Sequence, residues 1–194
     1  MACIETLLRH NADVNIPDGN QDTPLHWAVF KNKTRCVRTL LENGARVNSF
    51  DTNNDSPLSW AAQKGNLESM RLLLQYNARV DSYNLSGQSP LWKAARLVST
   101  GLSPDNDEEC LRLLIRASGQ FDLREDDEDS LPVNFRDDAR VRDMLLPLCR
   151  RPRRLQQLCR FTVRSCMPQV FVPRAVLSLP LPRSLQDFLQ LTDS

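Results

Sequence analysis

Thr23 to His26, with the sequence TPLH, is the stretch that decides the fold of this chain, because its pattern returns twice at a fixed distance. SPLS begins at Ser56 and SPLW begins at Ser89, so each stretch starts 33 residues after the one before it. In each stretch a hydroxyl side chain stands directly before a proline, which is the arrangement of a helix N-cap followed by the first helical turn. A regular period of this length predicts an all-α solenoid of stacked helical hairpins.

A short helix rich in alanine is predicted after each cap, and in the first two repeats a second helix with paired leucines comes after it. The small alanines let neighbouring repeats pack closely, while the leucines fill the space between the layers. Gly44 ends the second helix of one repeat, and Asn11 and Asn77 stand at the equivalent positions of two others. Asparagine tolerates the left-handed conformation of a helix-ending glycine, so we expect a positive φ at all three residues.

These features divide the first part of the chain, residues 1–150, into a series of units. We expect a partial repeat at 1–15, repeats at about 18–50, 51–83 and 84–122, and a degenerate closing unit at 123–150. The partial repeat starts at its second helix, whose apolar side is left uncovered. A fragment, a shortened isoform or a protein without its upstream repeats would each begin in this way.

The fourth repeat departs from the pattern of the others. Between a first helix at about Pro90–Leu97 and a second at about Asp107–Arg116, we expect a loop over residues 98–106 in place of a tight turn. An acidic run follows at residues 125–129, and because it lacks the glycine and the spacing of a calcium-binding loop, we interpret it as a solvated loop. In the closing unit, apolar periodicity predicts a further helix through Val141, Met144, Leu145 and Leu148.

The capped stretches, together with exits such as GARVN at residues 44–48, resemble ankyrin repeats. The resemblance implies a concave protein-binding surface made of the hairpin tips and the first helices. It also implies that His26 ties its repeat to the next one, and we expect less rigid junctions where Ser59 and Trp92 replace this histidine. The candidate substrate-binding residues on the concave surface are Trp27, Phe30, Lys31, Trp60 and Lys64.

Two tryptophans of this set, Trp27 and Trp60, occupy equivalent positions one repeat apart. We therefore expect their rings to lie close to one another along the groove. Packing between repeats is the alternative interpretation of both residues. Phe30 is an aromatic residue at a position where ankyrin repeats usually carry a polar one, so it is either a binding hot spot or a single exposed ring without a partner.

Two short amphipathic stretches follow near the C-terminus. Leu155, Cys159 and Val163 repeat at i, i+4 and i+8, with Leu158 beside them, and they predict one apolar stripe on a helix whose other faces carry polar residues such as Arg164. Ordinary core packing is the alternative for this stripe. In LPLPRSLQDFL, at residues 179–189, the two prolines exclude a helix through LPLP. The remaining apolar residues predict a short amphipathic helix after it.

Together the two stretches resemble the SOCS box, and ankyrin repeats followed by a SOCS box resemble the ankyrin repeat and SOCS box family. The resemblance predicts a three-helix SOCS box at residues 152–194, with a BC box at about 153–166 and a cullin box at about 176–191. It implies a substrate-recognition adaptor of a cullin-RING ubiquitin ligase. The ankyrin groove would hold an unknown protein substrate for ubiquitination and proteasomal degradation.

The resemblance also assigns partners to the two halves of the SOCS box. Elongin C, which travels with elongin B, would bind the BC box through Leu155, Leu158, Cys159 and Val163. Cullin five, with its RING partner, would bind the second half through Leu179, Pro180, Leu181, Pro182, Leu185, Phe188 and Leu189.

Composition limits the other classes of function. The chain has 194 residues, of which 41% are hydrophobic, and a net charge of +1, which argues against a membrane protein and against a strongly basic nucleic-acid binder. It lacks an apolar run of transmembrane length and the pattern of a signal peptide, so we expect an intracellular, cytoplasmic protein. Six cysteines without a CxxC pair, and only two histidines, indicate reduced thiols, no metal site and no cofactor.

Catalysis by the chain itself is the weakest of the alternatives. It would require a cysteine beside His10 or His26, and both histidines lie at structural positions of the repeats, so we expect no enzyme activity. Two stronger alternatives remain. The chain is either an ankyrin scaffold that recruits no ligase, or a truncated, non-productive form whose groove is too short for its substrate.

Overall fold

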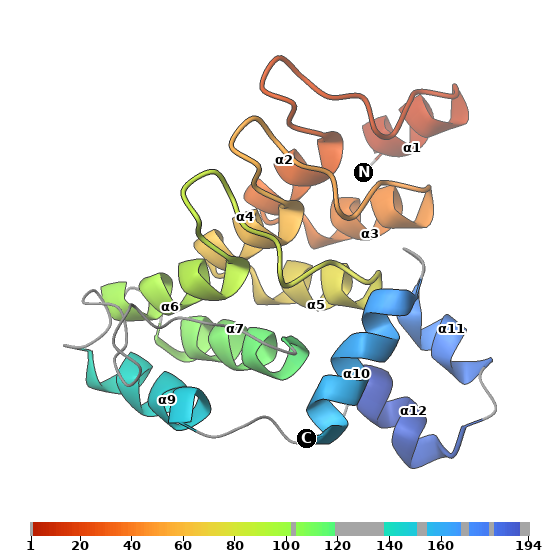
Figure 1. Ribbon diagram of the computed structural model, residues 1–194. Helices are drawn as coiled ribbons and strands as arrows, with labels where there is room; N and C mark the ends of the chain where they lie inside the picture. Colours follow the sequence, from red (N-terminus) through yellow and green to blue (C-terminus); the bar gives the residue numbers. More distant parts are fainter. Residues whose placement is uncertain are drawn as a thin grey trace.

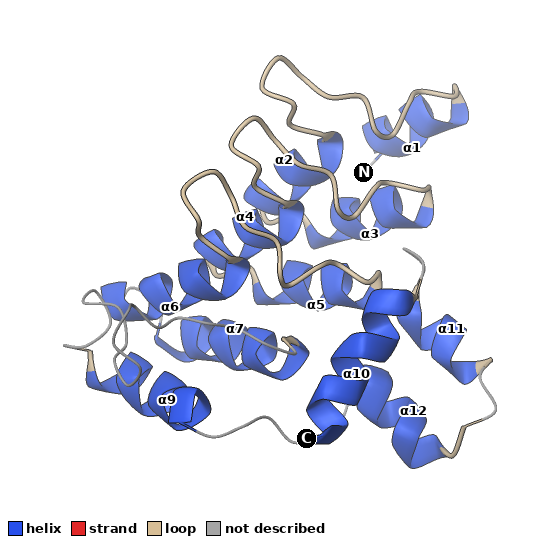
Figure 2. Cartoon of the chain, in the orientation of Figure 1, coloured by secondary structure: helices blue, strands red, loops and turns tan. Residues whose placement is uncertain are grey.

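The computed structural model describes residues 2–101, 104–118, 138–150, 155–167, 171–178 and 181–190, and within these residues every regular element is a helix (Figure 2). The helices of the stack lie in two layers, with the hairpin loops projecting from one side (Figure 1). The layer of first helices contains α2 (Pro24–Phe30), α4 (Pro57–Lys64) and α6 (Pro90–Thr100). The layer of second helices contains α1 (Ala2–Arg9), α3 (Thr34–Glu42), α5 (Leu67–Gln75) and α7 (Pro104–Ala117). The predicted all-α solenoid is confirmed.

The first helices begin at the predicted caps. The hydroxyl of Ser56 accepts a hydrogen bond from the backbone N–H of Ser59, and the hydroxyl of Ser89 accepts one from Trp92, both at 3.2 Å. The second helices end as predicted too, because φ is +58° at Asn11, +86° at Gly44 and +63° at Asn77. These left-handed residues turn the chain out of each hairpin and toward the next repeat.

The core follows the repeat. The leucines of the capped stretches, Leu25 and Leu58, are fully buried, as are the alanine pairs of α4 and α6. Because alanine adds so little volume, α4 and α6 pack closely against each other. The paired leucines of α3 and α5 fill the second layer, as expected.

Neighbouring repeats are also tied by repeated polar contacts. Asn15 accepts a hydrogen bond from the backbone N–H of Arg46 at 2.7 Å, and Asn48, 33 residues later, accepts one from Arg79 at 2.8 Å. At the hairpin tips the backbone N–H of Thr52 donates to Asn20 at 3.0 Å. These bonds hold the tips in register along the concave side.

The predicted loop over residues 98–106 is wrong. Helix α6 continues to Thr100 because Val98 packs in the core, and α7 already begins at Pro104. Gly101, with φ of +65°, ends α6. The inserted residues therefore lengthen the two helices of the fourth repeat, and most of the expected loop is helical.

The closing unit is described only from residue 138 onward. Its helix α9 (Ala139–Arg150) packs against α6 and buries Val141 and Leu145, in agreement with the apolar periodicity. The acidic run at 125–129 lies outside the described residues.

The last part of the chain forms α10 (Leu155–Cys166), α11 (Val172–Leu177) and α12 (Arg183–Gln190), which lie beside the second-helix layer (Figure 1). Val172, Val176 and Leu189 form a small core of their own. Phe161 of α10 packs against the main core of the stack. None of the described helices is long and apolar enough to cross a membrane.

Candidate protein-binding surfaces

An aromatic cluster lies on the first helices α2 and α4 and consists of Trp27, Phe30 and Trp60. The ring centroids are 6.1 Å apart between the two tryptophans, 5.9 Å between Trp27 and Phe30, and 5.6 Å between Phe30 and Trp60. All three pairs meet edge to face, the geometry that aromatic rings favour. The prediction that the two tryptophan rings lie close together is confirmed.

Both indoles are fixed by the hairpin of their own repeat. Nε1 of Trp27 donates to Asp18 at 3.0 Å, and Nε1 of Trp60 donates to Asp51 at 3.1 Å. The hydrogen bond from Trp27 lowers the pKa of Asp18 below its ordinary value, because it stabilises the carboxylate. The rings are therefore held in place before any partner arrives.

Two lysines lie close to the ring of Phe30. Nζ of Lys64 lies 4.6 Å from the ring centroid of Phe30, and Nζ of Lys31 lies 5.2 Å from it. Phe30 itself keeps 37% of its surface exposed. The five candidate substrate-binding residues, Trp27, Phe30, Lys31, Trp60 and Lys64, thus form one continuous surface, which we call the aromatic patch.

His26 lies beneath the aromatic patch in a structural role. Its Nδ1 accepts a hydrogen bond from the backbone N–H of Thr23 at 3.1 Å, so the proton is on Nε2, which donates to the carbonyl of Asp55 at 3.2 Å. Burial lowers the pKa of His26, because the charged imidazolium would lose its hydration. The predicted tie between repeats two and three is confirmed.

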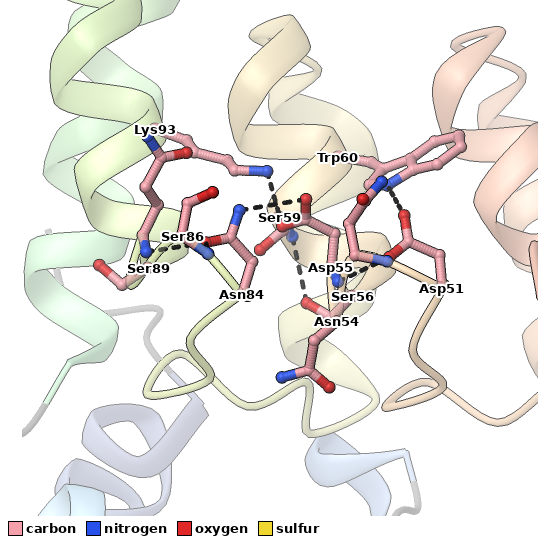
Figure 3. Close-up of polar contacts among 12 residues, drawn as sticks. Asp51, Asn54, Asp55, Ser56, Ser59, Trp60, Asn84, Ser86, Ser89 and Lys93 are labelled. Atoms are coloured by element: carbon pink, nitrogen blue, oxygen red, sulfur yellow. Dashed lines mark hydrogen bonds and ion pairs between the residues drawn. The ribbon is translucent and has the colours of Figure 1, made fainter.

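The fourth repeat breaks the row of tryptophans with a buried ion pair (Figure 3). Lys93 stands 33 residues after Trp60, and its Nζ lies 2.6 Å from Oδ1 of Asp55. Asn84 donates from Nδ2 to the other oxygen of the same carboxylate at 3.3 Å. Both charged side chains are more than nine-tenths buried. The junction between the third and fourth repeats, where Ser59 replaces the histidine, is therefore joined by the Lys93–Asp55 ion pair. The sequence carried a signal for this pair, because lysine replaces tryptophan at position 93 of the repeat pattern.

A pocket of about 530 Å³ lies beside this ion pair, between the aromatic patch and the fourth repeat. Arg96 lines its far wall, and the guanidinium carbon lies 5.7 Å from the centroid of Trp92. Trp92 and Arg96 were not among the candidate residues. Phe30, Trp60, Lys64, Trp92 and Lys93 line the same pocket.

Helix α10 exposes two residues of the predicted apolar stripe and buries a charged residue. Cys159 is exposed, and Val163 keeps 39% of its surface exposed, whereas Arg164 keeps only 6%. Core packing, the alternative for this stripe, is therefore wrong for Cys159 and Val163. The side chains of the other two candidates on this helix, Leu155 and Leu158, lie outside the described ones.

The candidate cullin-binding residues divide into an exposed group and a buried one. Pro182 is exposed, Leu185 keeps 47% of its surface exposed, and Leu181 is half-buried. Leu189, in contrast, is buried against Val172 and Val176. In this conformation it packs α12 onto α11 and is not accessible to a cullin. Leu179, Pro180 and the side chain of Phe188 lie outside the described residues.

Arg164 joins α10 to two other helices, a role that its place on the polar face of the predicted helix did not indicate. Its Nη1 donates to the carbonyl of Leu189 at 2.8 Å, and its Nη2 donates to the carbonyl of Leu74 at 2.5 Å. The side chain of Asn77 donates back to the carbonyls of Arg164 and Met167, each at 3.0 Å. These bonds connect the end of α5 in the stack with α10 and α12.

The described residues hold no group of three His, Cys, Asp or Glu side chains placed to bind a metal ion. Cys110 is buried, and the loss of hydration raises the pKa of its thiol to about 12. Such a thiol carries almost no thiolate at neutral pH and is a poor nucleophile.

Comparison with known families matches both parts of the chain. The SOCS box family matches residues 151–190, and the family described as ankyrin repeats (many copies) matches residues 1–37 and 25–74. Among curated proteins, similarity is found to Ankyrin repeat and SOCS box protein 8 of Homo sapiens and of Pongo abelii, each 47% identical, and of Mus musculus, 48% identical. Each match covers 97 residues, which is 50% of this chain and 33% of the relative. From the sequence alone, the stretches at 22–32 and 53–69 predict similarity to the eighth member of the ankyrin repeat and SOCS box family, and these matches confirm that prediction.

Proposed function

Because this chain belongs, by its ankyrin repeats and its SOCS box, to the ankyrin repeat and SOCS box family, we propose that it is a non-catalytic substrate-recognition subunit of a ubiquitin ligase. In this proposal the aromatic patch and the neighbouring pocket hold a protein substrate. The SOCS box joins the chain to the ligase, in the cytoplasm. Ubiquitination and proteasomal degradation of the substrate follow.

The reversed exposure of α10 is the observation that carries the proposal. An amphipathic helix in a finished core buries its apolar side and exposes its charges, and α10 exposes Cys159 and Val163 while it buries Arg164. An exposed apolar stripe on a helix is typical of a surface that binds another protein. We propose that elongin C, together with elongin B, covers this stripe, including Leu155 and Leu158.

A second exposed surface supports a separate contact to the cullin. Pro182 and Leu185 lie at the start of α12, one turn apart, and the proline restricts the backbone before any partner arrives. We propose that cullin five, with its RING partner, binds here and at the adjoining residues Leu179, Pro180, Leu181 and Phe188. Leu189 then keeps α12 in position from inside the SOCS box.

The mechanism of such a subunit is proximity. A receptor that holds a substrate near a ubiquitin-charged enzyme raises the local concentration of the reacting groups, and the bond-making chemistry occurs on other subunits. A fixed geometry between the groove and the SOCS box strengthens this effect. The bonds of Arg164 and Asn77 between stack and SOCS box provide such a fixed connection.

Co-expression with elongins B and C tests the proposal. We expect a soluble ternary complex, and we expect Val163→Asp to abolish it, because a carboxylate cannot be buried in an apolar contact. Leu185→Asp is the matched control, since it introduces the same charge on the other exposed surface. It should keep the elongins and lose the cullin.

The outcome that contradicts the proposal is equally defined. If the chain is recovered as a stable monomer in the presence of both elongins, the scaffold without ligase recruitment is the better description. Incubation of the purified chain alone with charged ubiquitin provides a separate check. Any transfer by the chain itself would exclude a purely non-catalytic role.

A further inference from the structure

We propose that the pocket between the third and fourth repeats selects an acidic peptide segment of the bound protein, in which Asp or Glu lies next to an apolar residue. The inference rests on the proposed role of the ankyrin groove in holding a substrate, and it adds the chemistry of the segment that is recognised.

The shape of the pocket fits a peptide segment. Its volume of about 530 Å³ lies within the range of sites that hold small ligands or a few side chains. Phe30, Trp60 and Trp92 are among its lining residues, so an apolar side chain finds aromatic surface there. The indole of Trp60 is already fixed by Asp51, so binding costs little side-chain entropy.

The acidic groups of the pocket are already engaged by donors of this chain. Asp51 accepts hydrogen bonds from the backbone N–H groups of Asn53 and Asp55, both at 2.8 Å, in addition to the bond from Trp60. Asp55 is neutralised by Lys93 and accepts a further bond from Asn84 (Figure 3). Lys93 therefore cancels the charge of Asp55, and the charge of Asp51 is spread over three hydrogen bonds. With Lys64 and Arg96 included, the charged side chains that line the pocket still carry a net charge of +1.

Two exposed cations of the pocket, Lys64 and Arg96, differ from Lys93 because they are not paired with an acidic group of the pocket. Lys64 and Arg96 are exposed, and neither forms an ion pair with any residue in the part of the chain that the structure describes. Each lies over an aromatic ring, Lys64 over Phe30 and Arg96 over Trp92, and both side chains line the same pocket. The charge left for a ligand is positive, so a carboxylate that enters the pocket finds cations without an ion-pair partner among the described residues.

A cationic ligand is the competing occupant, because aromatic clusters also bind ammonium groups. Here the ring of Phe30 already has Lys31 and Lys64 at 5.2 Å and 4.6 Å from its centroid. Another cation on this ring would lie well within one Debye length of both, and the repulsion would oppose binding. The same arrangement that disfavours a lysine or methyl-lysine peptide favours an acidic one.

The experiment uses the complex of the chain with elongins B and C and a positional-scanning library of ten-residue peptides. We expect libraries with a fixed Asp or Glu to bind several-fold more tightly than those with a fixed Lys, and an apolar residue to be enriched beside the acid. The double variant Lys64→Glu, Arg96→Glu should lose about tenfold in affinity for acidic libraries and turn the preference toward basic ones.

The control carries the same change of charge on the other layer of helices. Arg35→Glu with Arg38→Glu lies on α3, away from the pocket, and should leave the preference for acidic peptides unchanged. Loss of elongin binding by the unaltered chain would contradict the proposed function. An elongin complex that forms normally and yet prefers basic peptides, or binds none of the libraries, would overturn only the acidic-segment inference.

Discussion

The guanidinium of Arg164 in the SOCS box donates a hydrogen bond to the backbone carbonyl of Leu74, at the end of α5 in the ankyrin stack. A second bond from the same guanidinium reaches the carbonyl of Leu189 near the end of α12. The last carbonyls of a helix have no partner within the helix, and they attract positive charge. One buried side chain therefore contacts two helix ends and joins the two parts of the chain, and the carbonyl of Leu74 accepts a further bond from the backbone N–H of Asn77.

Replacement of Arg164 tests this connection. Arg164→Met keeps much of the volume and leaves the carbonyls of Leu74 and Leu189 buried without this donor, so we expect a loss of about 2–4 kcal/mol in the free energy of unfolding. Arg164→Lys should cost less than Arg164→Met because it keeps the charge and a donor. It should still cost some stability, because one ammonium group does not reach both carbonyls as the two guanidinium nitrogens do. Urea denaturation measures both variants, and equal stability of Arg164→Met and the unaltered chain would contradict the role.

The buried pair of Lys93 and Asp55 leads to a second prediction. Lys93→Met leaves a buried carboxylate without its counterion, and we expect a loss of about 3 kcal/mol or more. Arg112→Met breaks the exposed pair with Glu108 and should cost less than about 1 kcal/mol. A double-mutant cycle of Lys93→Met with Asp55→Asn gives the coupling directly, and a coupling near zero would show that the pair contributes nothing.

His26 makes stability depend on pH. Burial lowers the pKa of this histidine in the folded chain below the 6.5 of the unfolded chain, so at mildly acidic pH the unfolded state binds more protons. The contribution of His26 is thus fully present above about pH 6.5 and is lost as the pH falls toward the lowered pKa of the folded state. Urea denaturation at pH 7.5 and pH 5.5 should show this loss, and His26→Gln should reduce the difference. An equal difference in both proteins would rule out the assignment.

Alanine substitutions at Gly44 and Gly65 distinguish the cost of backbone strain from the cost of a steric clash. Gly65 and Gly44 both have positive φ, so alanine at either position costs about 1–2 kcal/mol. A Cβ at Gly65 would also lie 2.6 Å from Oδ1 of Asp107, whereas a Cβ at Gly44 meets nothing within 4 Å. Thermal unfolding should therefore show a larger loss for Gly65→Ala. The opposite order would mean that Asp107 moves aside freely.

The cysteines differ in their expected reactivity. At pH 8, iodoacetamide should label the exposed Cys159 and leave Cys110 unlabelled, because burial raises the pKa of Cys110 to about 12 and restricts access. Mass spectrometry of the labelled chain reads both sites. Addition of elongins B and C should protect Cys159, and continued labelling in the complex would contradict its place in the elongin contact.

Much of the fold could be predicted because its signals are local and repeated. The caps at Thr23, Ser56 and Ser89 predict where the first helices start, and the 33-residue spacing alone brings Trp27 and Trp60 together. The spacing did not predict the length of α6 and α7. Turn signals at Ser99 to Ser103 favoured a loop, and the burial of Val98 overrode them.

The sequence by itself determined the repeat, the caps, the left-handed helix ends and the two amphipathic stretches of the SOCS box, because each depends on residues a few positions apart or on an exact period. Only the tertiary structure decided that Lys93 is buried on Asp55, 38 residues away, and that Arg164 is buried on the carbonyl of Leu74, 90 residues away. A charged residue on a helix looks the same in the sequence whether water or a distant carbonyl receives it. Packing alone brings the distant partner within reach.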